Sequence, residues 1–284
     1  GATVVCKDVK AIDLNCGCPK PFSVDRGYGA ALVQKPDLLK DIVSTLSRNL
    51  PIPITAKIRL HHTLQGSMQL CKAVESGGGS AIAIHARFTE DRPNVAAIPR
   101  AVLPLANSVQ IPVIYNGDGF NPRDLKSLLK KSGCDSIMLA RGAMWNASLF
   151  RTVGKGQPML PPYDVARRYL KIAQLYENSV ENSRKNLACM MSFRKMMGAK
   201  GVRESAEKAL SFTDLETAVD AWEAGREHFM ATTNTRKQLG SNNAKKKYRA
   251  PLKLVHRKFE WKKEEKREGK QPCDRSRNIT NLTE

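Results

Sequence analysis

The first 150 residues of the chain alternate five times between a short apolar run and a segment whose apolar residues recur at helical spacing. Apolar or β-branched runs bounded by turn residues predict buried strands, and the intervening segments predict helices. The five predicted strands are Ala11–Leu14, Ile52–Ile58, Ala81–Ile84, Ile111–Tyr115 and Ser136–Leu139. Strands that alternate with helices favour an α/β fold built on a parallel sheet.

Proline and glycine mark the ends of several predicted helices. Pro36 and Pro122 stand where a helix can begin, because a proline in the first turn loses no helical hydrogen bond. Glycine at positions 77–79 and 133 is typical of helix ends. The apolar residues inside the two helices that begin at these prolines are Leu38, Leu39, Ile42, Val43 and Leu46, then Leu125, Leu128 and Leu129.

Polar and ionisable residues follow each predicted strand. In a (β/α)₈ barrel the C-terminal ends of the strands form a rim that carries the active site, and catalytic groups come from many strands. A doubly wound sheet instead has its site at one switch point in the strand order. We therefore predict a TIM-type (β/α)₈ barrel. Five strands do not close one, so about three βα units are expected to be missing before Gly1. The polar residues are Asn15 to Cys18, Lys57, Arg59, His85, Arg87, Asn116 to Asp118 and Arg141.

The strand signals stop near Pro161, and helical spacing of apolar residues takes over. We predict a partial barrel with the catalytic groups over residues 1–155, an α-helical domain over 156–235 and a basic tail over 236–284. The tail is Lys-rich with interleaved aromatic residues, and we expect it to be disordered or partly helical when free. The residues that carry the helical spacing are Val165, Tyr169, Ile172 and Tyr176, then Leu187, Met190, Met191 and Phe193.

The chain is strongly basic, with 47 Lys and Arg residues against 27 Asp and Glu residues and a formal net charge of +20. The excess is larger in the second half, since residues 1–150 carry +7 and residues 151–284 carry +13. Such a balance attracts polyanions, and nucleic acid is the usual partner of this distribution. An anionic membrane surface and simple solubility are the alternative explanations.

Cysteine usage and hydropathy indicate the compartment. No apolar run approaches the roughly 18 residues that cross a bilayer, and the charged and apolar regions of a signal peptide are absent. The seven cysteines have no framework spacing, which favours reduced thiols. We expect an intracellular protein that binds no membrane, in the cytoplasm with the nucleus as alternative. The chain starts with Gly1, which indicates a fragment, a processed form or an incomplete gene model.

Cys18 follows the first predicted strand and precedes a proline, so a barrel-rim loop would present its thiol to a bound ring. Two other interpretations stay open. Cys16 and Cys18 form a Cys-X-Cys pair, but no second pair stands at zinc spacing, and we predict no metal site. A lone cysteine is also more often buried and inert than catalytic.

Lys57, Arg59 and His85 end the second and third predicted strands. Strand alternation led us to expect one of Lys57 and Arg59 at the barrel mouth and the other elsewhere. Both could contact a ligand or simply form solvated strand ends. The His85 ring could approach a flavin or a phosphate, and a structural histidine is the alternative.

Two glycine-containing loops follow the fourth and fifth predicted strands. They are Asn116-Gly117-Asp118-Gly119 and Ala140-Arg141-Gly142. Many barrels build a phosphate site after their seventh and eighth strands, from backbone N–H groups and a helix start. Either loop alone would be a weak signal because turns need glycine anyway. Their consecutive order predicts a phosphate site.

Six motifs follow one another along the chain: Asn-X-Gly-Cys-Pro-Lys, Gly-X-Gly-Ala-Ala-Leu, Lys-Ile-Arg, Ile-His-Ala-Arg, Tyr-Asn-Gly-Asp and Leu-Ala-Arg-Gly-Ala-Met-Trp. With these motifs, about residues 8–150 are similar to the tRNA-dihydrouridine synthases. The Cys-Pro-Lys version of the first motif, the Asp-Arg-Pro stretch after His85 and the helical segment from Tyr169 most resemble the eukaryotic type-2 branch. The resemblance implies action at position 20 in the D-loop of cytoplasmic tRNA.

The resemblance implies a barrel joined to a helical domain, FMN as cofactor, NADPH or NADH as reductant, and tRNA as partner of a monomer. Hydride would pass from reduced flavin to carbon 6 of uracil while Cys18 protonates carbon 5. The target uridine would have to leave the folded tRNA, supported by phosphate contacts of the basic regions. By motif, the flavin would be contacted by Lys57 and His85. Its phosphate would be held by Asn116, Gly117, Asp118, Ala140 and Arg141. The rim near the uridine or its backbone would be lined by Asn15, Lys20, Arg59 and Arg87.

The sequence departs from the family pattern at its start. The family's first strand supplies a Pro-Met flavin contact and its third a polar contact, usually Gln, and neither has a counterpart here. Two alternatives therefore stand beside the synthase: a truncated RNA-binding product without enzymatic activity, and a flavin oxidoreductase of a small molecule. Cys16 stands where relatives commonly have an apolar residue, which indicates a packing role.

Overall fold

The computed structural model describes residues 1–154, 156–192, 201–238 and 259–261. All five predicted strands are present; β3 and β5 start where predicted, and the other ends differ by one to four residues. They are β1 (Ile12–Cys16), β2 (Ile54–Leu60), β3 (Ala81–Phe88), β4 (Val113–Asn116) and β5 (Ser136–Met138). They form one parallel sheet, which confirms the α/β prediction. Their order, β1-β2-β3-β4-β5, lacks the reversal of a doubly wound sheet.

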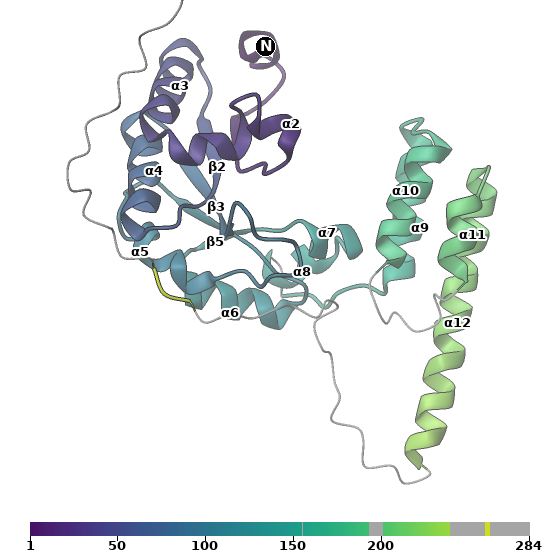
Figure 1. Cartoon of the computed structure of the whole chain (residues 1–284). Helices are drawn as coiled ribbons and strands as arrows, with labels where there is room; N and C mark the ends of the chain where they lie inside the picture. Colours follow the sequence, from purple (N-terminus) through teal and green to yellow (C-terminus); the bar gives the residue numbers. More distant parts are fainter. Residues whose placement is uncertain (155, 193–200, 239–258, 262–284) are drawn as a thin grey trace, which may run out of the picture.

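The predicted helices form between the strands, and their ends follow the proline and glycine signals (Figure 1). Pro36 opens α3 (Pro36–Asn49) and Pro122 opens α6 (Pro122–Ser132). Gly77 caps α4 (Leu64–Ser76), and Gly133 ends α6 with a φ of 68°, a left-handed conformation that favours glycine. The shorter elements are α1 (Ala2–Val5), α2 (Pro21–Val24), η1 (Gly29–Gln34), η2 (Pro99–Ala101), α5 (Leu103–Ala106), α7 (Arg141–Trp145) and α8 (Leu149–Gly154).

The sheet has one apolar face and one polar face, because successive side chains of a strand point to opposite sides. The apolar face forms a core with the helices, and Ile58, Ile84 and Tyr115 on it are fully buried. The opposite side, which we call the polar face, carries Asp13, Asn15, Thr55, Lys57, Arg59, His85, Arg87 and Asn116.

The expectation that Lys57 and Arg59 point in different directions is wrong. Strand side chains alternate with a period of two, so residues two apart share a face. The register confirms this, since Lys57 pairs with Ala83 and Arg59 with His85. Both cations therefore lie on the polar face. Arg59, His85, Arg87 and Asn116 were expected to follow the strands but belong to them, because β2, β3 and β4 extend beyond the C-terminal ends of their apolar runs.

A second core lies among α9 (Pro162–Leu175), α10 (Val180–Met191), α11 (Val202–Lys208) and α12 (Phe212–Gln238). These helices stand side by side, apart from the sheet (Figure 1). Leu170, Leu187 and Trp222 are fully buried there. The predicted helical residue Phe193 lies outside the described residues. Within the described ranges, no helix is long and apolar enough to cross a membrane.

Most of the predicted basic tail, residues 236–284, lies outside the described residues. Its first three residues complete α12, which ends at Gln238. Phe259 and Trp261 are half-buried and pack against the hydrophobic core that the apolar face of the sheet forms with the helices. Their ring centroids lie 6.2 and 6.3 Å from that of Phe88 at the end of β3. This short stretch therefore packs on the sheet domain, which the prediction of a disordered or partly helical tail did not anticipate.

The Tyr115 hydroxyl should lower stability. Its side chain is fully buried and its oxygen has no hydrogen-bond partner among the described residues. A buried polar group without a partner costs roughly 1–3 kcal/mol. We expect Tyr115→Phe to raise the free energy of unfolding by about 1 kcal/mol, measured by urea denaturation. Tyr115→Ala, which also removes the ring, should lower it by roughly 4 kcal/mol. A less stable Tyr115→Phe variant would contradict the assignment.

Candidate functional site

The C-terminal ends of β2, β3 and β4 bring three predicted site residues side by side. His85 pairs with Arg59 on one neighbouring strand and with Asn116 on the other. Asn15 and Lys57 form the next pair along the polar face. The side-chain amide of Asn116 donates to the backbone oxygen of Met138 at 2.9 Å, which ties β4 to β5. Parallel pairing thus gathers residues as far apart in the chain as Asn15 and Asn116 on one face of the sheet.

A pocket of about 200 Å³ opens at this rim, between the ends of β3, β4 and β5. It is smaller than the roughly 300–1,000 Å³ typical of complete ligand sites. Three guanidinium groups line it against two carboxylates, so its charge favours an anion. The lining residues are Arg59, His85, Arg87, Asp91, Pro93, Asn116, Gly117, Asp118, Gly119, Phe120, Met138, Leu139, Ala140, Arg141 and Gly142.

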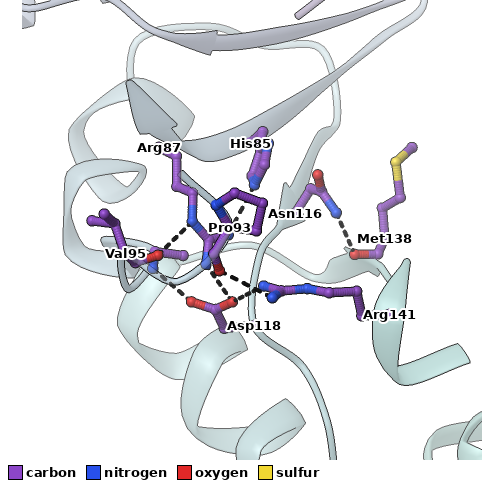
Figure 2. Close-up of polar contacts among 9 residues, drawn as sticks. His85, Arg87, Pro93, Val95, Asn116, Asp118, Met138 and Arg141 are labelled. Atoms are coloured by element: carbon purple, nitrogen blue, oxygen red, sulfur yellow. Dashed lines mark hydrogen bonds and ion pairs between the residues drawn. The ribbon is translucent and has the colours of Figure 1, made fainter. Parts of the chain in front are cut away.

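Asp118 is the centre of a buried charge cluster (Figure 2). Its Oδ1 accepts hydrogen bonds from Arg87 Nη2 at 2.5 Å and from Arg141 Nη2 at 2.8 Å. Its Oδ2 accepts from the backbone N–H of Ala97 at 2.6 Å. Both oxygens of the carboxylate are therefore occupied by protein donors. As an anion, Asp118 is not a direct contact for a phosphate. It orients the cations around the pocket instead.

Arg141 reaches across the pocket from the first residue of α7, which follows β5. Nη1 donates to the backbone oxygen of Pro93 at 3.0 Å, and the guanidinium lies 5.2 Å from the centroid of the Phe120 ring. Its side chain is 27% exposed, which leaves it accessible to a ligand in the pocket. Burial lowers the pKa of Arg141, and Asp118 opposes that shift.

His85 is electrically neutral at working pH. Burial, followed by the charges of Arg59, Lys57, Arg87 and Arg141, lowers its pKa to about 2. Each of these cations disfavours a further positive charge nearby. The ring can therefore act as a hydrogen-bond donor and acceptor, but it carries no charge for an anion to pair with.

Lys57 and Arg59 occupy different environments on the same face. Burial and then the charge of Arg59 lower the pKa of Lys57. Arg59 is 9% exposed, and its Nε donates to the backbone oxygen of Gly17 while Nη1 donates to that of Phe88, both at 2.8 Å. Arg59 thus fastens the loop before Cys18 to the end of β3.

Cys18 lies on a loop that the following segment closes. The backbone N–H of Ala30 donates to the oxygen of Cys18 at 2.9 Å. Gly29 has a φ of 55° and packs so tightly that a Cβ there would lie 2.7 Å from the Cys18 oxygen and 2.9 Å from its Cβ. Cys18 is half-buried, whereas Cys16 is fully buried on the apolar face, where burial and then Asp13 raise its pKa to about 12.

The two glycine loops pack against one another. A Cβ on Gly142 would overlap the backbone oxygen of Gly119. Gly117 has a φ of 152°, and a Cβ there would lie 2.7 Å from that of Ala97. Asp118 itself has a φ of 29°, which is unusual for a residue with a side chain. Only glycine allows these backbones to approach so closely, which explains the glycine pattern without reference to a ligand.

The pocket brings most of the predicted site residues together, but four do not line it. Cys18 and Lys57 are half-buried outside the pocket. Asn15 and Lys20 are exposed, and the side chain of Asn15 accepts from the N–H of Gly17. Arg59 and Arg87 line the pocket but donate to protein acceptors. Sequence reasoning missed the pocket residues Asp91, Pro93, Phe120, Met138 and Leu139.

One of the missed residues carried a readable signal. Asp91 lies three residues after the last residue of β3, and its Oδ2 accepts the backbone N–H of Phe88 at 2.8 Å. Aspartate at that spacing is typical of turns that a side chain closes. Phe120, Met138 and Leu139 have no such signal. Their place in the pocket depends on how the loop after β4 packs against the end of β5. In the part of the chain that the structure covers, no group of three or more His, Cys, Asp or Glu side chains is placed to hold a metal ion.

Comparison with known proteins identifies similar chains. The family model described as "Dihydrouridine synthase (Dus)" matches residues 1–231. The tRNA-dihydrouridine(20) synthase of Schizosaccharomyces pombe is 33% identical over 77% of this chain and 46% of its own length. A human tRNA-dihydrouridine(20a/20b) synthase-like protein is 34% identical over 52% of this chain and 48% of its own. The chain thus spans about half the length of these curated relatives.

We expect Gly29→Ala to disturb Cys18 and Gly27→Ala to leave it unchanged. Both glycines have positive φ, 55° and 80°, so either alanine costs about 1 kcal/mol in backbone strain. Only Gly29 has Cys18 atoms within contact, while Gly27 has nothing within 4 Å. Gly29→Ala should therefore lower the free energy of unfolding by roughly a further 1–3 kcal/mol. It should also change the rate at which iodoacetamide alkylates Cys18, followed by peptide mass spectrometry. Equal effects of the two variants would contradict this packing.

His85 should make the protein less stable in mild acid. Its pKa is about 2 in the folded state and roughly 6.5 when unfolded, so below pH 6.5 the unfolded chain binds the extra proton. Stability is therefore complete above about pH 6.5 and falls with decreasing pH. Between pH 7 and pH 5 we expect a loss of about 2 kcal/mol, measured by urea denaturation. His85→Gln should remove this component, and an unchanged pH slope in that variant would refute the burial of a neutral ring.

Proposed function

Since residues 1–231 match its model, the chain belongs to the dihydrouridine synthase family, and we propose that it reduces uridine in tRNA to 5,6-dihydrouridine. The proposal concerns the full-length protein, because the chain spans about half the length of the relatives. The observation that carries it is the arrangement of Lys57, His85 and the two glycine loops on one rim of a parallel sheet, with the Cys18 loop fastened to the end of β3 by Arg59.

We propose that the five strands belong to an eight-stranded barrel that about three further βα units complete. Two features support this arrangement. The strands follow one another across the sheet in chain order, as barrel strands do. The polar face is also open at β1, where Asp13 and Asn15 are exposed, whereas Ile54 and Ile58 on the apolar face are buried.

FMN is the proposed cofactor, with its phosphate at the pocket beside Arg141. A net positive lining and a volume of about 200 Å³ suit the phosphate end of a flavin rather than the whole molecule. Gly117, Ala140 and Gly142 line the pocket, and their backbone N–H groups are the proposed donors to that end. Asn116 and Asp118 would hold the loops in shape through Met138, Arg87 and Arg141.

Lys57 and His85 are the proposed contacts to the flavin ring. When bound, the flavin supplies the hydride, which it takes from NADPH or NADH. The partly buried ammonium of Lys57 offers positive charge to an electron-rich ring, and the neutral imidazole of His85 offers a hydrogen bond. Neither residue is proposed to transfer the proton to uracil.

Cys18 is the proposed proton donor to carbon 5 of the uracil ring. Its thiol lies on a loop that Gly29, Ala30 and Arg59 hold in place, and it is half-buried at the rim. A positioned general acid contributes roughly 10²–10⁴-fold to a reaction rate. Cys16 is not a candidate because its side chain is buried on the opposite face of the sheet.

The proposed substrate contacts change in one respect from the sequence prediction. Asn15 and Lys20 are exposed next to the Cys18 loop and remain the proposed contacts to the uridine or its backbone. Arg59 and Arg87 are buried and donate to protein acceptors, so we propose that they position the site instead.

We propose a division of labour along the chain: flavin binding by 1–155, tRNA binding by the helices of 156–235, and non-specific phosphate contacts by the basic residues of 236–284. The formal net charge of +20 supports a polyanionic substrate. The target would be position 20 in the D-loop of cytoplasmic tRNA, and the enzyme would act as a monomer in the cytoplasm or nucleus.

Cys18→Ala should separate the two half-reactions of the full-length protein. We expect NADPH to reduce the bound flavin at the wild-type rate, because no proton from Cys18 is needed for that step. Formation of dihydrouridine in tRNA, measured by mass spectrometry of nucleosides, should fall by roughly 10²–10⁴-fold. Cys16→Ala is the matched control and should retain both rates.

Two results would refute the proposal. One is a full-length protein that purifies without flavin absorbance, together with a deletion strain whose tRNA keeps its D-loop dihydrouridine. The other is a wild-type rate of dihydrouridine formation in Cys18→Ala, which would leave the flavin site intact but assign the proton to a different group.

A further inference from the structure

Arg87 is almost fully buried at the wall of the pocket, with 2% of its side chain exposed. Each nitrogen of its guanidinium group meets a different acceptor (Figure 2). Nε donates to the backbone oxygen of Val95 at 2.7 Å, Nη1 contacts His85 Nε2 at 3.0 Å, and Nη2 donates to Asp118 Oδ1 at 2.5 Å. The side chain therefore connects His85, its neighbour on β3, to the loop at Val95 and to the glycine loop of Asp118.

The contact between Arg87 and His85 can run in only one direction. A guanidinium group has N–H donors and no acceptor, and it stays protonated in proteins. His85 Nε2 must therefore accept the hydrogen bond and carry no proton. The ring is neutral because it is buried among Arg59, Lys57, Arg87 and Arg141. A neutral imidazole holds its one proton on the other nitrogen, which here is Nδ1.

We propose that Arg87 is a positioning residue that holds His85 as the Nδ1–H tautomer and ties its ring to the loop of Asp118. His85 then offers one fixed donor, with no competing acceptor, to a ligand in the pocket. Such a donor suits a carbonyl oxygen, an unprotonated ring nitrogen or a phosphate oxygen. That the ligand is a flavin rests on the proposed function, whereas the tautomer follows from the protein alone.

Asp118 makes the arrangement rigid. Its Oδ1 also accepts from Arg141, and its Oδ2 accepts from the backbone of Ala97, so its carboxylate has little freedom to move. Three hydrogen bonds in a row thus lead from Arg141 through Asp118 and Arg87 to His85. These bonds fix the distance between the side chains of Arg141 and His85. Two groups of one ligand that contact these side chains are therefore held at a fixed separation.

The tautomer can be measured directly by nitrogen-15 NMR of the histidine side chains, without flavin or tRNA. The chain has five histidines, and His85→Gln identifies the signals of His85 by their loss. In the wild-type protein we expect an unprotonated Nε2 and a protonated Nδ1 from pH 5 to pH 8. A protonated Nε2, or a ring that titrates in this range, would overturn the proposal.

Variants of Arg87 test whether this residue is the cause. Arg87→Met removes every donor, and Arg87→Lys keeps the positive charge beside Asp118 but loses the planar fork that serves three acceptors at once. In either variant that folds, His85 should lose its fixed Nδ1–H tautomer. Arg141→Met is the matched control, because it removes a partner of the same carboxylate without touching His85, and the tautomer should be unchanged.

FMN binding provides the functional measurement. We expect Arg87→Lys to weaken FMN binding by about tenfold, a factor that corresponds to one hydrogen bond to a charged group. An unchanged tautomer in a folded Arg87 variant would overturn the proposal, as would the same loss of tautomer in Arg141→Met. Wild-type protein that shows the expected tautomer but binds no FMN would support the role of Arg87 and contradict the proposed function, so the two failures are distinguishable.

Discussion

The site depends on a single buried carboxylate. Asp118 accepts hydrogen bonds from Arg87 on β3, from Arg141 at the start of α7, and from the backbone N–H of Ala97 in the loop after β3. Breaking a buried ion pair by removal of one partner leaves an uncompensated charge, which is strongly unfavourable. Loss of Asp118 would therefore leave Arg87, Arg141 and the N–H of Ala97 without their shared acceptor. The pocket is the space that this cluster leaves at the ends of β3, β4 and β5.

The cluster can exist because strand alternation sorts the residues first. One face of the sheet is apolar and buries Ile54, Ile58 and Ile84 against helices, which provides the stability of the fold. The other face is thereby left for charged residues that would be costly in a core. Parallel register then places Arg59, His85 and Asn116 side by side. Chemistry at the rim thus follows from the same periodicity that forms the core.

The fold was largely predictable from the sequence, and the roles of the site residues were less so. Five apolar runs with glycine and proline between them were enough for the strands, the helices and the rim, because those signals are local. The sequence could not show that Asp118 is used internally, since its partners Arg87 and Arg141 lie 31 and 23 positions away. It also suggested ligand contact for Arg87, whose burial depends on the loop at Val95.

The charge around His85 also divides the work between the side chains of the rim. With four cations nearby, the imidazole stays neutral well below physiological pH, so it has no proton to give as an acid there. The two buried arginines stay protonated and act only as donors. Cys18, by contrast, sits half-buried on a loop that Arg59 fastens to the end of β3. The same guanidinium that helps to keep His85 neutral therefore also holds the loop of the proposed proton donor. One side chain thus connects the proposed flavin contact with the proposed proton donor.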